Sequence, residues 1–326
     1  MVRGSRKWAR GGLGLGFVVA VSTLLTSCSS ASGSSAGLVR SAGCHSGAGR
    51  APTTTAVAPS ASATAIGSTA LHTVSLRVDG RTATYLVEAP PSASHRPVPL
   101  VVLFHGAGVD ANYIARLTEL PARGVRRGVL VAVPNSAGKS WDANPDGPDG
   151  HLVGAMLASL SLQYCVDKSR VSLVGLSAGA VFAVRYACRH SGEFAAIATV
   201  TVEYQLGCTL PLSILAYHGT ADPTVPYAGA PGDAVAGLRA TGTLTNMAAW
   251  AQLNDCDRTP VTTRVASQVE RRTWTNCAAG AEVVLYTILG GGHTWPDADQ
   301  PAHFGMTTHQ LDATSEALDF FARHST

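Results

Sequence analysis

The chain has 326 residues, of which 46% are hydrophobic and 14% are charged, as in a folded protein with a large buried core. Its net charge of +3 comes from the N-terminus, because Arg3, Arg6, Lys7 and Arg10 all precede the first acidic residue, Asp79. The rest of the chain has no excess of Lys and Arg that could neutralise phosphates, so the composition argues against a nucleic-acid binder.

The first 27 residues have the pattern of an export signal. A cationic segment over residues 1–10 precedes an apolar run over residues 11–25, which is shorter than the roughly 20 residues of a membrane-spanning helix. The sequence Leu25-Thr26-Ser27-Cys28 then resembles the bacterial lipobox, in which the cysteine is lipidated and becomes the mature N-terminus. We therefore expect a lipoprotein signal peptide over 1–27, with acyl chains on Cys28 that hold the protein to the extracellular side of the cell membrane. Ordinary secretion is the alternative.

Residues 28–70 predict a flexible tether. Ser, Ala, Gly, Thr and Pro dominate this segment, and it has too few large side chains to offset the entropy cost of ordering it. The folded part is therefore expected over residues 71–326, as one domain.

The cysteine count is consistent with export. Seven cysteines are present, and without Cys28 the remainder is even, which suggests disulfides in an exported protein. Cys256 and Cys277 flank a short polar stretch and form the expected local pair. The other four can pair in three ways, which the sequence leaves open: Cys44, Cys165, Cys188 and Cys208. No Cys or His spacing suits zinc, so no metal is expected.

Strand and helix patterns alternate from residue 71 onward. Two alternating segments, 72–78 and 82–88, flank Asp79-Gly80, a typical hairpin turn. Apolar runs typical of buried parallel strands lie at 100–104, 129–133, 171–174, 194–200, 212–217 and 283–288. Helical patterns lie at 111–126, 151–164, 178–190, 244–254 and 311–324. The alternation predicts a three-layer α/β domain with a mostly parallel central sheet and helices on both faces.

A serine lies at the sharpest of these strand-to-helix junctions. The sequence Gly175-Leu176-Ser177-Ala178-Gly179 separates the apolar run 171–174 from the helical pattern 178–190. Small residues on both sides suit the tight turn of a nucleophile elbow, as in α/β hydrolases. The motif alone is weak, because the chain contains 34 glycines, but its position strengthens it. We predict that Ser177 is a nucleophile.

A serine nucleophile needs a base, and in an α/β-hydrolase sheet the acid and the histidine follow later strands in that order. Asp222 lies just past the run 212–217, and His293 lies in the glycine-rich loop after 283–288. Other titratable residues fit less well. His218 suits a packed structural position, and Asp297 and Asp299 suit a solvated loop. His303 and His309 lie past a proline-rich turn, farther from any strand end. We therefore predict that Asp222 and His293 complete a triad.

Catalysis of acyl transfer also requires donors for the oxyanion. The backbone N–H of Ala178, directly after the nucleophile, is one expected donor. The other is expected from the loop after residue 104, with Ala107 preferred and Gly108 as the alternative.

The motifs LFHG, GLSAG, HGTADPTVPY and GGGHTWP, in this order, resemble the polyhydroxybutyrate depolymerase/feruloyl esterase group of α/β hydrolases (carbohydrate esterase family 1-like). The resemblance covers about residues 71–326 and implies that the predicted triad is the family's own. It also implies that Trp141 lines the substrate cleft and that Asp149 lies near the site as structural support. Trp295 follows His293 closely in sequence, so we expect it, like Trp141, to offer its ring face to an aromatic group or a sugar of the substrate. The segment 201–207 departs from the family pattern.

These observations together predict a secreted or lipid-anchored serine esterase without a cofactor. It would hydrolyse carboxylic esters of short-acyl, feruloyl or hydroxyalkanoate type, free or on a polymer, through an acyl-enzyme. The short segment between residues 200 and 212 leaves no room for a large lid domain. Two alternatives remain: an inactive hydrolase-fold surface protein that binds a polymer, and a serine peptidase on the same fold.

Overall fold

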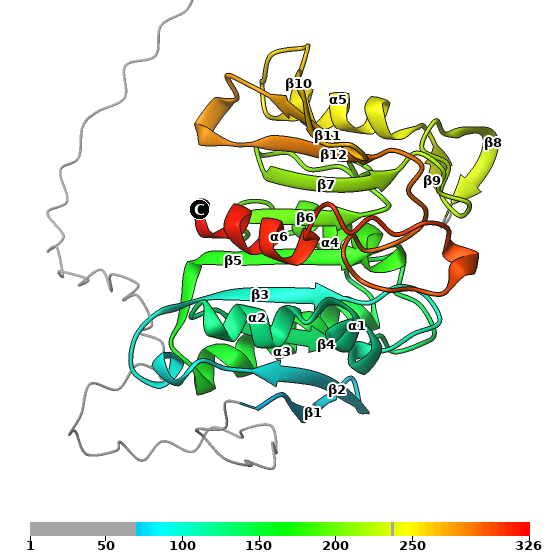
Figure 1. Ribbon diagram of the computed structural model, residues 1–326. Helices are drawn as coiled ribbons and strands as arrows, with labels where there is room; N and C mark the ends of the chain where they lie inside the picture. The colour runs from blue at the N-terminus through cyan, green and yellow to red at the C-terminus, as the bar shows by residue number, and fades with distance from the viewer. Residues whose placement is uncertain (1–69, 236–237) are drawn as a thin grey trace, which may run out of the picture. The chain divides into compact units, whose positions relative to one another are not determined.

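A computed structural model describes residues 70–235 and 238–326 (Figure 1). The predicted signal peptide, Cys28, Cys44 and the tether up to residue 69 lie outside the described residues. Within the described ranges, no helix has the length and apolar character needed to cross a bilayer.

One sheet of 10 strands organises the domain, in the order β1-β2-β4-β3-β5-β6-β7-β12-β11-β10 (Figure 1). Its central strands all run parallel, which confirms the prediction from the apolar runs. They are β3 (Val98–Phe104), β4 (Leu130–Pro134), β5 (Val166–Leu176), β6 (Ala196–Val200), β7 (Ser213–Gly219) and β12 (Val283–Ile288). Since parallel strands end at the same edge, the loops after β3, β5, β7 and β12 gather there.

Both edges of the sheet are antiparallel. The expected hairpin of β1 (His72–Val78) and β2 (Arg81–Glu88) forms one edge. A hairpin of β10 (Val261–Ala266) and β11 (Val269–Trp274), not anticipated from the sequence, extends the other edge beyond β12. Most side chains of β10 are exposed, so this strand lacks the apolar run that identified the others.

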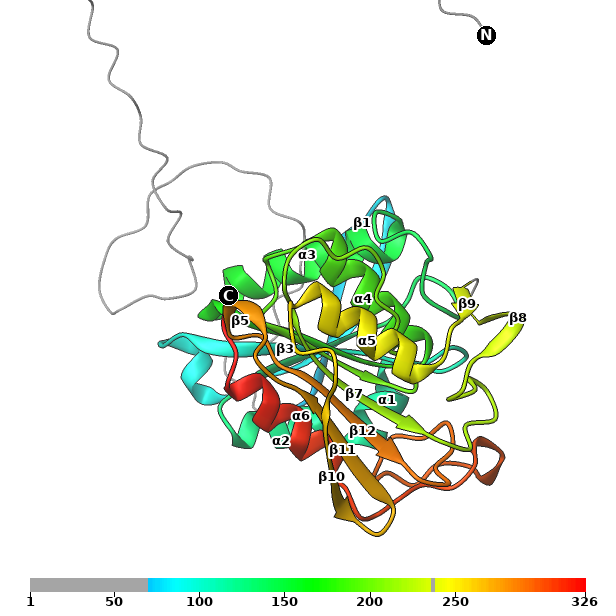
Figure 2. The ribbon, with the colours of Figure 1, turned by 90° about the horizontal axis from the view of Figure 1, so that it is seen from above.

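Helices cover both faces of the sheet (Figure 2). One face carries α3 (Pro148–Gln163), α4 (Ala178–Arg189) and α5 (Thr243–Leu253). The opposite face carries α1 (Ala111–Thr118), α2 (Leu120–Arg126) and α6 (Ala313–Ala322). Successive side chains of β3 alternate between the two cores: Leu100, Val102 and Phe104 pack on the first, and Val101 and Leu103 on the second.

Two expectations about local structure were wrong. The helix expected over 111–126 is two helices, because Glu119 adopts φ 50° and Pro121 begins a new turn. The region 228–243, in which no strand or helix was expected, contains the strands β8 (Ala230–Val235) and β9 (Leu238–Ala240). Short 3-10 turns complete the described structure: η1 (Pro91–Ser94), η2 (Ala278–Gly280) and η3 (Ala302–Phe304).

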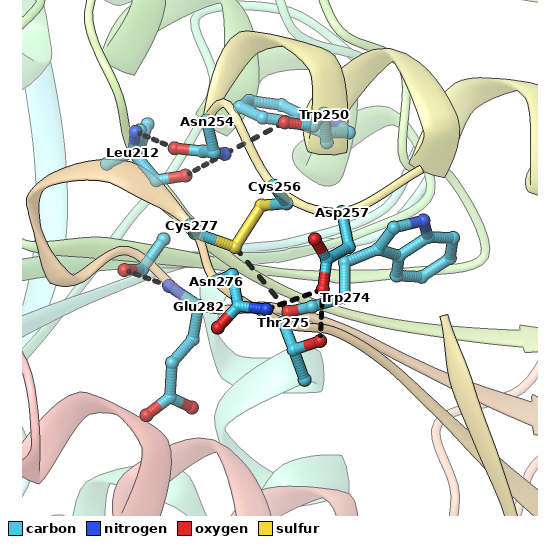
Figure 3. Close-up of a disulfide and its surroundings, with 11 residues drawn as sticks. Leu212, Trp250, Asn254, Cys256, Asp257, Trp274, Thr275, Asn276, Cys277 and Glu282 are labelled. Atoms are coloured by element: carbon cyan, nitrogen blue, oxygen red, sulfur yellow. Dashed lines mark hydrogen bonds between the residues drawn. A yellow bond between two sulfur atoms is a disulfide. The ribbon is translucent and has the colours of Figure 1, made fainter. Parts of the chain in front are cut away.

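Disulfides fasten the helices to neighbouring segments. The expected Cys256–Cys277 bond is present and ties the end of α5 to the chain after β11 (Figure 3). Beside it, Asn254 bonds both the N–H and the carbonyl of Leu212, just before β7 (Figure 3). A second bond, Cys188–Cys208, joins the end of α4 to the β6–β7 connection. Cys165 is also disulfide-bonded.

Candidate active site

Ser177 occupies the turn between β5 and α4, as predicted. Its backbone has φ 55° and ψ −119°, a conformation that costs a non-glycine residue on the order of 1–3 kcal/mol. Its N–H donates to the carbonyl oxygen of Val200 at the end of β6 (3.0 Å). The strained turn therefore holds the serine at the edge of the sheet, which is the geometry of a nucleophile elbow.

The glycines of the motif permit the backbones to touch. A methyl group at Gly175 would collide with the backbone of Gly179, and one at Gly179 would collide with the carbonyl oxygens of Phe104 and His105. The first turn of α4 thus packs directly on the ends of β5 and β3. No side chain fits between them, which explains why the motif requires glycine at both positions.

The loop after β3 lies against the nucleophile. A methyl group built on Gly106 would be 3.7 Å from Cβ of Ser177. Gly108 already donates its N–H to the carbonyl of Lys139 (2.7 Å). Within the described residues, the N–H groups of Ala107 and Ala178 have no protein acceptor. This difference favours Ala107 over Gly108 as the second oxyanion donor.

A buried histidine and tryptophan support that loop. His105 bonds the carbonyl of Gly106 through Nδ1 (2.7 Å), and its Nε2 accepts the N–H of Ser136 (3.2 Å). Burial lowers the pKa of His105, in agreement with a neutral ring whose Nε2 is an acceptor. The indole N–H of Trp141 donates to the carbonyl of His105 (2.7 Å). These bonds fix the backbone that carries the candidate oxyanion donors.

Two of the three residues expected near the substrate cleft, Asp149 and Trp295, are almost completely buried. Asp149 is 1% exposed and accepts the N–H groups of Ala137 and Asp142, and its burial raises its pKa. Trp295 is 1% exposed and donates to Thr314 in the core, so the expectation that it offers a face to substrate is wrong.

Trp141 differs from Trp295, because it backs the loop after β3. It is 8% exposed, and its ring packs against Phe104 and Phe182. Contact between Trp141 and a substrate remains a prediction.

Asp222 uses its two carboxylate oxygens differently. Oδ1 accepts the N–H groups of Thr224 and Val225, both at 2.7 Å, which closes the turn after β7. Oδ2 accepts a hydrogen bond from Nδ1 of His293 at 2.8 Å. Asp222 therefore both caps its own loop and orients the imidazole.

The loop that carries His293 is held by backbone contacts on both sides. The N–H of His293 donates to Phe304 (2.6 Å), and that of Gly292 donates to Met306 (2.9 Å). A methyl group at Gly219, at the end of β7, would collide with the carbonyl of Gly291. The loop after β12 thus lies directly on the loop after β7, which brings His293 and Asp222 together.

The other ring nitrogen of His293 faces the ends of β5 and β6. Its Nε2 is 3.5 Å from Oγ1 of Thr201. Leu176 and Val200 are register partners in these strands, so Ser177 and Thr201 are adjacent positions at the sheet edge. Oγ of Ser177 has no hydrogen bond within the described part of the chain; in free enzymes such bonds are often long and tighten with substrate.

Sequence reasoning missed several residues of this region. Thr201 adopts φ 69°, which is rare for a β-branched residue, and contacts His293. Glu203 is 2% exposed and bonds His218, which lies beside Asp222. Their partners are 15 to 92 residues away in sequence, so only the departure of 201–207 from the family pattern could have indicated them. Among the described residues, no cluster of three or more His, Cys, Asp or Glu could hold a metal ion.

Comparisons with known proteins agree with this geometry. A family model described as "Esterase PHB depolymerase" matches residues 83–207. "Putative esterase NocK" of Nocardia uniformis subsp. tsuyamanensis is 30% identical over 74% of this chain and 80% of its own length. The chain belongs to this esterase family.

Other relatives of the esterase are more distant. "Feruloyl esterase B" of Piromyces equi is 26% identical over 62% of this chain, and the match spans 40% of that protein. An acetyl xylan esterase structure from Aspergillus awamori has a TM-score of 0.53 at 16% identity, over 74% of this chain and 94% of that one. The latter supports the α/β-hydrolase fold. The esterase therefore hydrolyses ester bonds, and within its described residues the β6–β7 connection forms no lid domain.

Proposed function

We propose that this esterase is a serine hydrolase in which Ser177, His293 and Asp222 act as a catalytic triad. The observation that carries the proposal is the 2.8 Å bond between His293 Nδ1 and Asp222 Oδ2, with Nε2 facing the sheet edge where Ser177 is strained. Each residue stands at the end of a different central strand, the arrangement that α/β hydrolases use.

The reaction follows from these positions. Oγ of Ser177 attacks the ester carbonyl while His293 Nε2 accepts its proton, and the Asp222 carboxylate stabilises the imidazolium. The N–H groups of Ala178 and Ala107 bind the developing oxyanion. His293 then protonates the leaving alcohol, which departs to leave an acyl-enzyme on Ser177. Water, activated by the same imidazole, releases the acid and restores the serine.

The proposed substrates are short-acyl, feruloyl or hydroxyalkanoate esters, free or attached to a polymer. The absence of a lid in the described β6–β7 connection supports access for an ester on a large molecule, and the feruloyl esterase relatives support an aromatic acid.

The first test is hydrolysis of p-nitrophenyl esters of increasing acyl length, with methyl ferulate and a soluble hydroxybutyrate oligomer in parallel. Ser177→Ala is the matched control, and a fluorophosphonate should label the wild type at Ser177 alone. Loss of turnover and of labelling in the variant is expected. A folded wild-type protein that turns over none of these esters would instead support the polymer-binding alternative; cleavage of peptide amides would support the peptidase alternative.

We also propose that the esterase is exported and anchored through lipidated Cys28. The disulfides of the folded part support an oxidising compartment. Full-length protein made in a bacterial host should partition into the detergent phase of a Triton X-114 extraction, and Cys28→Ala should move it to the aqueous phase. Equal partitioning of the two proteins would contradict the anchor.

A further inference from the structure

A second histidine lies behind the acid of the proposed triad. His218, on β7, is 2% exposed, and its Nε2 lies 3.5 Å from the same Asp222 oxygen that bonds His293. On its other side, Nδ1 lies 2.7 Å from Oε2 of Glu203, which is also 2% exposed. The imidazole of His218 thus separates two buried carboxylates.

The hydrogen-bond partners of His218 indicate which nitrogens carry protons. Nε2 is 2.9 Å from the carbonyl oxygen of Val225, which can only accept, so Nε2 must be protonated. Nδ1 faces the Glu203 carboxylate and the hydroxyl of Thr243 (2.8 Å). With Glu203 ionised, Nδ1 must donate as well, because an unprotonated nitrogen would place its lone pair against the carboxylate.

The rest of the network completes the hydrogen bonding of Glu203. Its Oε1 accepts from Asn246 on α5 (2.9 Å), and its backbone carbonyl accepts from Trp250 (2.8 Å). A buried charge is stable only when paired and hydrogen-bonded, and both conditions are met for Glu203 and His218.

Burial is the largest single effect on the pKa of His218 and lowers it. The charge and hydrogen bond of Glu203, the hydrogen bond to Val225 and the charge of Asp222 act in the opposite direction, and together they raise the pKa overall. The other ionisable group packed on the ring is Tyr227, whose own ring lies edge-on at 5.5 Å. Burial raises the pKa of Tyr227, which therefore stays neutral at pH 7.

We propose that His218 is a positioning residue for the esterase reaction: an imidazolium, held by Glu203, that fixes the same carboxylate oxygen of Asp222 that bonds His293. This inference rests on the proposed triad. Its positive charge lies next to the carboxylate that orients His293, so the loss of this charge should change the pH dependence of the reaction. Glu203, on the connection fastened by Cys188–Cys208, in turn keeps His218 charged.

Glu203→Gln is the informative variant, because the side chain keeps its shape. The amide oxygen of the variant can still accept from Asn246, but the amide nitrogen would donate to Nδ1 of His218, which leaves a neutral imidazole in the same place. His218→Gln removes the imidazole altogether. Tyr227→Phe is the control, since it removes a partly buried hydrogen bond to Thr287 near the same ring without a change in charge.

The direct measurement is ¹⁵N NMR of histidine-labelled full-length protein, with His218 assigned by its absence in His218→Gln. We expect a doubly protonated His218 at pH 7 in the wild type and in Tyr227→Phe, and a neutral ring in Glu203→Gln. A neutral His218 in the wild type at pH 7 would overturn the proposal.

The functional measurement is the pH profile of kcat/KM for p-nitrophenyl acetate. In Glu203→Gln we expect a roughly tenfold lower kcat with little change in KM, and in His218→Gln a loss of about tenfold to hundredfold. The acidic limb should move up by about one pH unit in His218→Gln and by less in Glu203→Gln. Lower thermal stability with an unchanged pH profile would mean that the pair only packs the core.

The two proposals fail in different ways. If Ser177→Ala retained activity, the triad would be wrong, but a doubly protonated His218 would still be seen in the wild type by NMR. If the triad variants were inactive and His218 were neutral, only the positioning role would be lost.

Discussion

Around Ser177 the chain is positioned by close backbone contacts, whereas around Asp222 and His293 such contacts are joined by hydrogen bonds between ionisable side chains. On the first side, Gly175 and Gly179 allow a helix to touch two strands with no side chain between them. On the second side, the carboxylate of Asp222 accepts hydrogen bonds from two backbone N–H groups and from the imidazole of His293. It also lies beside the buried His218.

This difference follows from what each side does in the proposed reaction. The nucleophile needs a fixed, strained backbone, and steric contact supplies it without ionisable groups at the turn itself. His293 must gain and lose a proton while the carboxylate of Asp222 keeps its ring oriented, which requires polar partners. The Ser177 side should therefore be sensitive mainly to added side-chain volume, and the Asp222 side also to changes of charge.

The largest effect is expected from Asp222→Asn. The new side chain can still accept the N–H groups of Thr224 and Val225, so the turn should persist. Its amide, however, would donate towards Nδ1 of His293 and stabilise the wrong tautomer, which should lower kcat by about 10⁴-fold, as in other triads. Steady-state kinetics together with a thermal melt would check this. A loss of less than tenfold in a folded variant would exclude Asp222 as the triad acid.

On the Ser177 side, we expect added side-chain volume at Gly179 to lower the stability of the protein strongly. In Gly179→Ala the added methyl group collides with two backbone carbonyls, which cannot move aside as a flexible side chain could. We expect a loss of about 3 kcal/mol in unfolding free energy, measured by urea denaturation.

Gly154→Ala is the matched control for that loss. This glycine is exposed on α3, and the nearest atom to an added methyl group is the hydroxyl of Tyr186 at 3.7 Å. It should be neutral or stabilising by up to about 1 kcal/mol, because alanine favours the helix. Equal losses in the two variants would show that close packing at the elbow is not what requires Gly179.

Removal of either of the two described disulfides should lower stability, but only one removal should lower activity as well. They close loops of similar length, with sequence separations of 20 and 21 residues, so removal of either should cost about 3 kcal/mol. Only Cys188–Cys208 holds the connection that contains Thr201 and Glu203. The double alanine variant of this pair should also lose several-fold in kcat/KM, whereas that of Cys256–Cys277 should not. Equal activity of the two variants at a temperature where both are folded would contradict a role of this connection in the site.

The parallel centre of the fold could be predicted because its strands are buried on both faces. Each of these strands, such as Leu130–Pro134, is a short, continuous apolar run, a pattern typical of a buried strand. The hairpin of β10 and β11 could not, since β10 is mainly polar and exposed and is defined by its pairing partner. The break at Glu119 was also missed, because helical spacing continues through it although Pro121 begins a new helix.

The candidate site divides in the same way. Ser177, Asp222 and His293 stand in loops after predicted strands, so the prediction that they gather at one edge followed from the topology of a parallel sheet. Glu203 and Thr201 gave no such signal, because their positions depend on contacts with residues far along the chain. The misjudgement of Trp295 has the same origin, since proximity to His293 in sequence does not show which way a ring points.

The smallest effects are expected on the pH dependence of the unfolding free energy. They have opposite signs for His105, near Ser177, and for His218, near Asp222. His105 is held neutral by burial, so its pKa in the folded state is lowered from an ordinary value of 6.5. The unfolded chain takes up this proton first, and the contribution to stability is lost as the pH falls below about 6.5. The pKa of His218 is raised instead, so its contribution is full at low pH and is lost as the pH rises through the raised value.

Urea denaturation at pH 5, 7 and 9 should reveal the difference. Between pH 7 and 5, His105→Asn should lose less unfolding free energy than the wild type, by on the order of 1 kcal/mol. Between pH 7 and 9, His218→Gln should lose less than the wild type. If the stability of both variants followed the wild-type pH dependence, the protonation of neither histidine would be coupled to folding. The difference between the two sides of the site would then be supported only by the glycine and aspartate variants.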